Sequence, residues 1–156
     1  MIGSKIQNLI AEALKARDEV RLSTLRLLSS AFNYERIALQ RDLTQEDELR
    51  VIKKEAKKRH DAIEALRQAQ GKSTSSDPET LNKRLKQEER ELEILKEFLP
   101  VEMSEEELSQ LIGESINQLG AKTLKDLGRV IGEVMKKAGG RADGAKVAEM
   151  VKNKLL

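Results

Sequence analysis

Apolar residues recur every three or four positions in seven stretches of the chain, which is the spacing expected for one face of an α-helix. The stretches lie at about residues 3–15, 19–40, 45–70, 78–98, 105–119, 124–137 and 144–156. Polar turn residues, glycine or proline separate them, as they commonly do between helices. The pattern predicts an all-α protein.

Short polar motifs mark the expected helix ends. N-caps are expected at Ser4, Thr44, Asp77 and Ser104. Their side-chain oxygens would accept hydrogen bonds from the free N–H groups of a first helical turn. Gly71 follows the third helix, where a residue in the left-handed conformation would end that helix at the least cost.

The stretch around Pro100 separates long helices from short ones. Proline disfavours the α conformation in the residue before it, so the fourth helix should end at Phe98 or Leu99. We therefore predict two helical subdomains, residues 1–99 and residues 100–156. The first is a bundle of long helices that includes a helical hairpin, and the second is a small subdomain of three helices.

The third and fourth helices each carry an apolar stripe with one charged position. When the two helices are folded antiparallel so that Ala56 faces Leu92, Arg59 comes opposite Glu88. We predict coiled-coil-like packing in this hairpin, with an Arg59–Glu88 pair in its seam. Such a pair would fix the register more than it would add stability.

The second helix, at residues 19–40, is apolar around much of its circumference. Leucines occur on several of its faces, for example Leu22, Leu25, Leu27 and Leu28. A helix that is apolar on more than one face is expected to be buried on more than one face. We therefore expect it to be the central helix of the N-terminal bundle.

The composition excludes several classes of site. The 156 residues include 36% charged residues, only three aromatic residues and no cysteine. Disulfides, thiolate metal sites and cysteine nucleophiles are therefore excluded. His60 is the single histidine, and the sequence places no nucleophile or orienting acid beside it, so a surface position is expected. We expect neither a metal nor a cofactor.

The hydropathy of the chain argues against a membrane location. No stretch approaches 18 consecutive apolar residues. Residues 1–10 lack the apolar core of a signal peptide. We expect a soluble, cytoplasmic protein with no membrane partner.

The net charge of +2 hides an uneven distribution. Residues 72–121 carry 6 basic and 12 acidic side chains, whereas residues 122–156 carry 9 basic and 4 acidic ones. A basic tail attracts polyanions, although an ordinary solvated helix face has a similar composition. The candidate nucleic-acid-binding residues are Lys125, Arg129, Lys136, Lys137, Arg141 and Lys146, with Lys53 and Lys57 on the third helix. No aromatic residue follows Phe98, so contacts to phosphates are expected there rather than base stacking.

Several glycines of the tail have expected structural roles. Gly128 and Gly132 stand four residues apart inside a predicted helix, where each glycine costs about 1 kcal/mol relative to alanine. Close packing of a neighbouring helix is the favoured explanation, and close approach of a ligand backbone is the alternative. Gly140 and Gly144 would permit a turn, and Asp143 would cap the last helix.

The order of motifs in the tail resembles that of a known family. Residues 127–132 (LGRVIG), residues 140–144 (GRADG) and the final helical segment 146–152 resemble the C-terminal motif of the GatB/YqeY family. Residues 24–28 (TLRLL) and 98–100 (FLP) fit the same family, so that the resemblance covers almost the whole chain. The chain looks like a stand-alone YqeY-like protein.

The resemblance implies two all-helical subdomains and a link to tRNA. GatB is a subunit of the tRNA-dependent amidotransferase, which converts misacylated Glu-tRNA or Asp-tRNA with ammonia from glutamine. Its helical tail contacts tRNA, and similar modules are appended to glutaminyl-tRNA synthetase. The resemblance also implies a relationship to carbon–nitrogen ligases that use glutamine as amido-N donor.

Three hypotheses for the function follow. The first is an accessory module that binds the tRNA phosphate backbone and assists tRNA-dependent amidation or glutaminyl-tRNA synthesis without an active site of its own. The second is a protein–protein adaptor that docks its acidic hairpin on an aminoacyl-tRNA synthetase or an amidotransferase. The third is a catalytic subunit of the carbon–nitrogen ligase, against which the chain has no P-loop, no cysteine and only residues 73–76 in place of a Gly/Ser-rich amidase segment.

Overall fold

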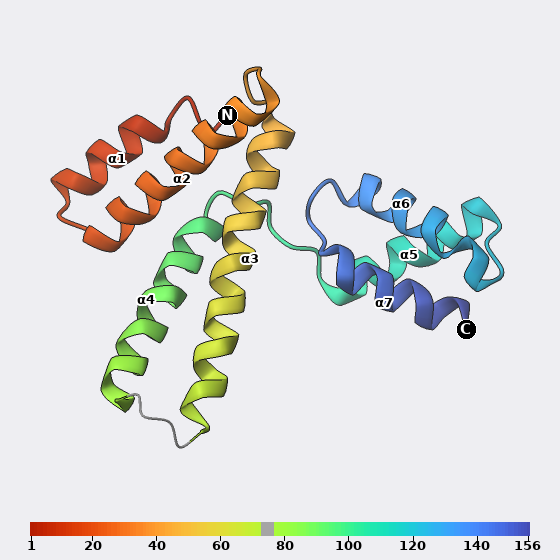
Figure 1. The fold of residues 1–156 in the computed structure, drawn as a ribbon. Coiled ribbons are helices and arrows are strands. Elements are labelled where there is room, and N and C mark those ends of the chain that lie inside the picture. The colour runs from red at the N-terminus through yellow and green to blue at the C-terminus, as the bar shows by residue number, and fades with distance from the viewer. Residues whose placement is uncertain (73–76) are drawn as a thin grey trace. The chain divides into compact units, whose positions relative to one another are not determined.

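The computed structural model describes residues 1–72 and 77–156, and the regular structure in these ranges is entirely helical (Figure 1). The helices are α1 (Ile6–Lys15), α2 (Glu19–Leu39), α3 (Gln45–Gln70), α4 (Pro78–Lys96), α5 (Glu105–Leu119), α6 (Leu127–Ala138) and α7 (Gly144–Leu155). A short 3-10 helix, η1 (Leu124–Asp126), precedes α6. The all-α prediction is confirmed. The serine-containing segment 73–76 lies outside the described residues.

The chain forms two compact units, Met1–Leu99 and Pro100–Leu156. Each has a hydrophobic core of its own. In the described parts of the chain, no helix has both the length and the apolar character needed to cross a bilayer.

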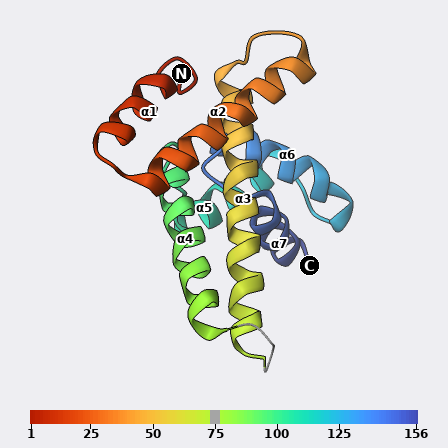
Figure 2. The same ribbon diagram turned by 60° about the vertical axis from the view of Figure 1, so that its left-hand side comes forward.

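In the first unit, α3 and α4 lie side by side and antiparallel, as Figures 1 and 2 both show. Thr44 and Asp47 form a capping box at the start of α3, and the Asp77 carboxylate accepts a hydrogen bond from the Thr80 N–H at the start of α4. Pro78 occupies the first helical position, where a missing N–H costs nothing. The hairpin predicted from the two apolar stripes is therefore present.

The seam of the hairpin contains two carboxylates instead of one. The Arg59 Nε atom lies 3.8 Å from a carboxylate oxygen of Glu88, but only 2.7 Å from one of Glu91. Glu91 is also the more buried of the two glutamates. The Gln87 side-chain amide donates a hydrogen bond to the same carboxylate at 3.1 Å. The predicted Arg59–Glu88 pair forms, while the closer partner lies one position outside the stripe, within reach of the long arginine side chain.

Helix α2 is the central helix of the first unit, as predicted, because it packs against α1, α3 and α4. The core of the first unit brings Leu28 and Phe32 of α2 together with Ile6 of α1, Ile52 of α3 and Leu95 of α4. The buried residues of α2 are Thr24, Leu25, Leu28 and Phe32, so burial extends around only part of its circumference and less far than the leucine pattern predicted. The opposite side stays exposed although it carries large apolar residues.

Two predicted helix ends differ from the structure. Ser4 does not cap α1, because its hydroxyl donates to the Met1 carbonyl, and α1 begins only at Ile6. The buried Glu48 carboxylate of α3 instead accepts hydrogen bonds from the N–H groups of residues 2 and 3, at 2.7 and 3.1 Å. Gly71 is not left-handed, since its φ of −79° is helical.

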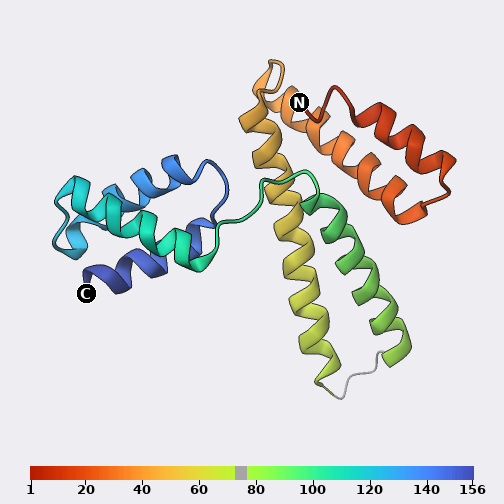
Figure 3. The same cartoon turned by 180° about the vertical axis from the view of Figure 1, so that it is seen from behind.

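In the second unit, α5, α6 and α7 pack around a core of aliphatic side chains (Figure 3). Ser104 and Glu107 form a capping box before α5. Gly120 ends α5 with a φ of +62°, and Gly140 lies in the turn before α7 with a φ of +88°. The Asp143 carboxylate accepts a hydrogen bond from the Lys146 N–H and so caps α7.

Candidate nucleic-acid interface

Helix α6 has one buried side and one open side. Its buried residues Val130, Val134 and Ala138 recur every four positions and pack into the core of the second unit. The helix therefore presents its other side to solvent, where Gly128, Arg129, Gly132 and Lys136 are all exposed.

Gly128 and Gly132 make no close contact with protein. A Cβ atom added at either position would meet no atom of the described chain within 4 Å. The favoured explanation, close packing of a neighbouring helix, is therefore wrong. The physical reason is the position of the glycines on α6, because α5 and α7 cover the opposite side. Both glycines weaken the helix, and no packing against the described residues compensates for the loss.

Three cations border these glycines. The side chains of Lys125 and Lys136 form no hydrogen bond or ion pair with any residue that the structure describes. Arg129 donates to the Leu119 carbonyl at 3.1 Å and lies 3.2 Å from the Asp126 carboxylate. We call the surface formed by Lys125, Gly128, Arg129, Gly132 and Lys136 the α6 cationic face.

Arg141 has a role within the fold. Its guanidinium Nε donates to the Val101 carbonyl at 3.0 Å, and its own backbone carbonyl accepts from the Met103 N–H at 2.8 Å. The Arg141 Nη2 atom lies 3.8 Å from a carboxylate oxygen of Glu107. These contacts tie the segment before α5 to the turn before α7. Arg141 is therefore less available for phosphates than its place in the sequence suggests.

The other two cations predicted on the second unit already have acidic partners. The Lys146 ammonium lies 2.8 Å from the Glu105 carboxylate, and this contact raises the pKa of Lys146 and lowers that of Glu105. Lys137 contacts Glu133 at 3.5 Å and the side-chain oxygen of Gln118.

Lys53 and Lys57 lie on α3, in the first unit. Lys53 is half-buried, whereas Lys57 is exposed and contacts Asp61 at 3.0 Å. The sequence prediction also omitted Lys122, an exposed lysine whose side chain has no partner among the described residues. Only its charge and its nearness to Lys125 in the sequence could have indicated it.

Comparison with known families identifies the chain. The family model for Yqey-like protein matches residues 3–155. The chain belongs to the YqeY-like family. The match covers both compact units, so the resemblance drawn from the LGRVIG and GRADG segments is confirmed at the level of the family. No protein in the curated set matches the chain.

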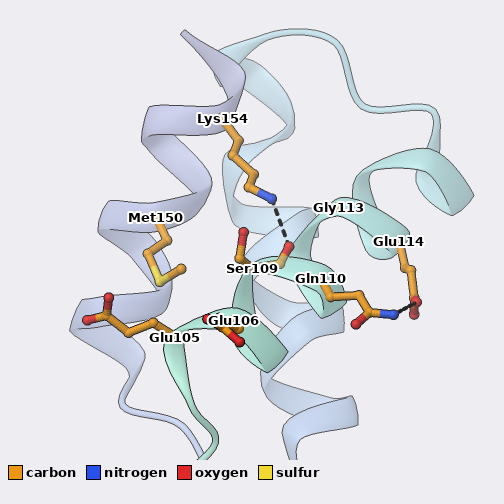
Figure 4. Close-up of a pocket in the computed structure, with 8 residues that line it drawn as sticks. All are labelled: Glu105, Glu106, Ser109, Gln110, Gly113, Glu114, Met150 and Lys154. Carbon is orange, nitrogen blue, oxygen red and sulfur yellow. Dashed lines mark hydrogen bonds between the residues drawn. The ribbon is translucent and has the colours of Figure 1, made fainter.

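A hollow of this YqeY-like chain lies between α5 and α7 and is acidic. It has a volume of about 680 Å³ and is lined by Glu105, Glu106 and Glu114, with Met150 and Lys154 on α7 (Figure 4). The Lys154 ammonium is turned to the Ser109 carbonyl, to which it donates at 2.7 Å. Three carboxylates repel phosphate groups, so this hollow is a poor site for RNA.

The remaining candidate for chemistry is His60. It is exposed on α3, and its imidazole lies 3.9 Å from the Asp61 carboxylate. Within residues 1–72 and 77–156, no three His, Asp or Glu side chains are grouped so that they could hold a metal ion.

Proposed function

We propose that this YqeY-like chain is a tRNA-binding accessory module whose α6 cationic face contacts the phosphate backbone. The observation that carries the proposal is the pair of open glycines, Gly128 and Gly132, between unpaired or partly paired cations. Glycine inside a helix is destabilising relative to alanine and so calls for a compensating reason, and no contact within the described chain supplies one. A phosphate strand that passes close to the helix would supply it.

The spacing of the cations suits a backbone contact. Arg129 and Lys136 are seven residues apart, which is about 10 Å along a helix, and the two glycines share the side that they border. Each cation would neutralise a separate phosphate. Because Gly128 and Gly132 have no side chains, a phosphate strand could approach the helix backbone between the two cations. The second unit carries no aromatic residue, so binding would rest on charge and shape rather than on base stacking.

We further propose that the chain assists tRNA-dependent amidation or glutaminyl-tRNA synthesis beside a catalytic partner. The family relationship supports the link to tRNA. The sequence contains no cysteine and no P-loop pattern, so it offers neither a thiol for glutamine hydrolysis nor an ATP-phosphate loop. The proposed role is therefore to hold tRNA.

The adaptor hypothesis has weaker support, because the acidic face of α4 is largely neutralised within the first unit. Two glutamates of α4 and the residue that follows the helix contact arginines, in the pairs Glu89–Arg67 at 3.1 Å, Glu93–Arg90 at 3.0 Å and Glu97–Arg21 at 2.8 Å. A partner protein would have to compete with these contacts, whereas the α6 cationic face is available as it stands.

Two double variants of the full chain test the proposal. Arg129→Ala/Lys136→Ala removes two charges from the α6 cationic face. Lys86→Ala/Lys152→Ala removes two charges from exposed positions on α4 and α7 and is the matched control. The slope of log K for tRNA against log salt is negative. We expect the first variant to make it shallower by about 1.4 to 1.8, because two phosphate contacts are lost, and the control to leave the slope unchanged. An equal loss of affinity in both variants would contradict a defined contact surface.

A further inference from the structure

The exposed side of α2 carries a stripe of large apolar residues. Leu27, Tyr34 and Ile37 are 52%, 76% and 69% exposed. In Figure 1 the C-terminal end of α2 extends past α1 toward the start of α3. Large apolar residues scattered singly need no explanation, but three on one side of one helix form a candidate interface.

Charged residues are nearly absent from this stretch. From Leu27 to Gln40 only Glu35 and Arg36 are charged, in a chain in which 36% of the residues are. Glu35 is turned to α3, where its carboxylate lies 3.6 Å from Arg50. Depletion of charge around an aromatic residue is typical of the buried centre of a protein interface.

The exposed residues follow the spacing of paired helices. Ser23, Leu27, Ser30, Tyr34 and Ile37 are separated by alternating steps of four and three, and all five are exposed. This is the spacing of the contact positions in a coiled coil, where each such residue packs against a partner helix. The stripe therefore fits a single straight helix laid along α2.

We propose that the helix covering this stripe is α2 of a second copy of the chain, in antiparallel orientation. When the two helices are aligned with residue 32 of each at the two-fold axis, Leu27 faces the partner's Ile37 and Ser30 faces the partner's Tyr34. The two-fold axis repeats both contacts, as an isologous interface requires. A small residue opposite a large one, and one branched aliphatic residue opposite another, leave neither a clash nor a gap.

The proposed alignment is the one that brings Leu27 and Ile37 together. A shift of one heptad in one direction places Leu27 opposite the partner's Thr44, beyond the end of α2, and a shift in the other direction places Ile37 opposite the half-buried Val20. Beside the seam, Arg26 comes near the partner's Gln40, and Asn33 near the partner's Asn33. No two like charges meet, and the polar groups flanking the seam can form hydrogen bonds. The dimer would be a weak one, since three large apolar residues per copy make a small interface.

This proposal is independent of the RNA contact, which lies on another helix in the other compact unit. The first measurement is sedimentation of the full-length chain over a wide range of concentration. We expect the mass to rise from that of one 17.6 kDa chain toward twice that value. A single-chain mass at every concentration would overturn the proposal. If Tyr34 fluorescence in that monomer is also shielded from soluble quenchers, another part of the same chain covers the stripe.

Paired variants test the orientation. Leu27→Lys alone and Ile37→Glu alone should each abolish the dimer, because each places a charge against an aliphatic residue. The double variant Leu27→Lys/Ile37→Glu should restore it, because in the antiparallel register each new lysine faces a new glutamate of the other copy. Leu14→Lys, at another exposed leucine on α1, is the control and should leave the dimer intact.

The outcomes separate the alternatives. Rescue by the double variant supports the antiparallel register, since a parallel pair would bring lysine to lysine and glutamate to glutamate. A dimer that survives both single variants, or that the Leu14→Lys variant also abolishes, would overturn the assignment to α2. All these positions are exposed, so circular dichroism should show unchanged helix content in every variant.

Discussion

At the scale of single residues, Arg59 shows how one long side chain sets the geometry of the hairpin. Its guanidinium lies between the carboxylates of Glu88 and Glu91 in a seam that is otherwise apolar. Removing one partner of a largely buried charge group leaves the other charges without compensation. Breaking the cluster should therefore lower the free energy of unfolding by more than the intact cluster contributes to it.

The Arg59→Met variant tests this account. We expect it to lower the free energy of unfolding by about 2–3 kcal/mol, because both carboxylates lose their cation. The triple variant Arg59→Met/Glu88→Leu/Glu91→Met should recover most of the loss, since an apolar seam needs no charge compensation. Urea unfolding followed by circular dichroism measures both. A neutral effect of Arg59→Met would show that the pair does not act in the seam.

The sequence indicated Arg59 and Glu88 but not Glu91. Seam positions follow from the three-and-four spacing, so opposite residues can be matched by counting. Glu91 lies beside the stripe, and its burial depends on where the arginine side chain turns. Glu48 is a similar case, because its bonds to the first residues of the chain join segments 45 residues apart, and no local pattern predicts such a contact.

At the scale of helices, carboxylates at helix starts make the fold sensitive to acid. Glu107 accepts a hydrogen bond from the Ser104 N–H at 2.9 Å, which lowers the pKa of Glu107, with a further contribution from the charge of Arg141. Asp126 accepts from the N–H groups of Lys122 and Thr123, which lowers the pKa of Asp126. A folded-state pKa below the unfolded value means that the folded protein binds fewer protons.

The stabilisation from Glu107 is therefore complete above its unfolded pKa, about 4.3, and is lost as the pH falls through the lower folded pKa. We expect the wild type to lose more stability between pH 7 and pH 3 than the Glu107→Gln variant does. Urea unfolding at several pH values measures the difference. Glu106→Gln, at an exposed neighbour in the same first turn, is the control and should follow the wild type. Parallel profiles for the wild type and Glu107→Gln would contradict the capping role.

The glycines of α6 allow stability and binding to be separated. Gly128→Ala/Gly132→Ala should raise the free energy of unfolding by about 1 kcal/mol per site, because alanine favours the helix and the added methyl groups meet nothing. The same variant should bind tRNA less tightly if a phosphate strand passes over the two positions. Gly113→Ala on α5 is the matched control and should leave binding unchanged. A more stable variant with unchanged tRNA affinity would argue against the α6 cationic face as the contact surface.

Helix positions were predicted well from the sequence, whereas the faces that stay open were not. Caps such as Thr44 and Asp143 act within one turn, so local sequence determines them. Which side of α2 or α6 is covered depends on where other helices pack, which is a property of the tertiary structure. For this reason the sequence led us to expect Leu27 to be buried and a neighbouring helix to pack on Gly128, and both expectations were wrong.

At the scale of the whole molecule, the availability of each cation matters more than the net charge. The basic tail was evident from counting residues, but Lys137, Arg141 and Lys146 already make contacts within the second unit. Lys125, Arg129 and Lys136 remain on the open side of η1 and α6. Counting charges along a sequence cannot separate these groups, because the pairing depends on distances in the folded chain.

The most direct test of the account is a titration of the full-length chain against bulk tRNA at several salt concentrations, with duplex DNA as the competitor. We predict saturable binding that weakens steeply with salt, by roughly 0.7 to 0.9 in the slope of log K against log salt per neutralised phosphate. We also predict a preference for folded tRNA over the duplex. Absence of binding at low salt, or equal affinity for both nucleic acids, would contradict the proposal that this chain is a tRNA-binding module.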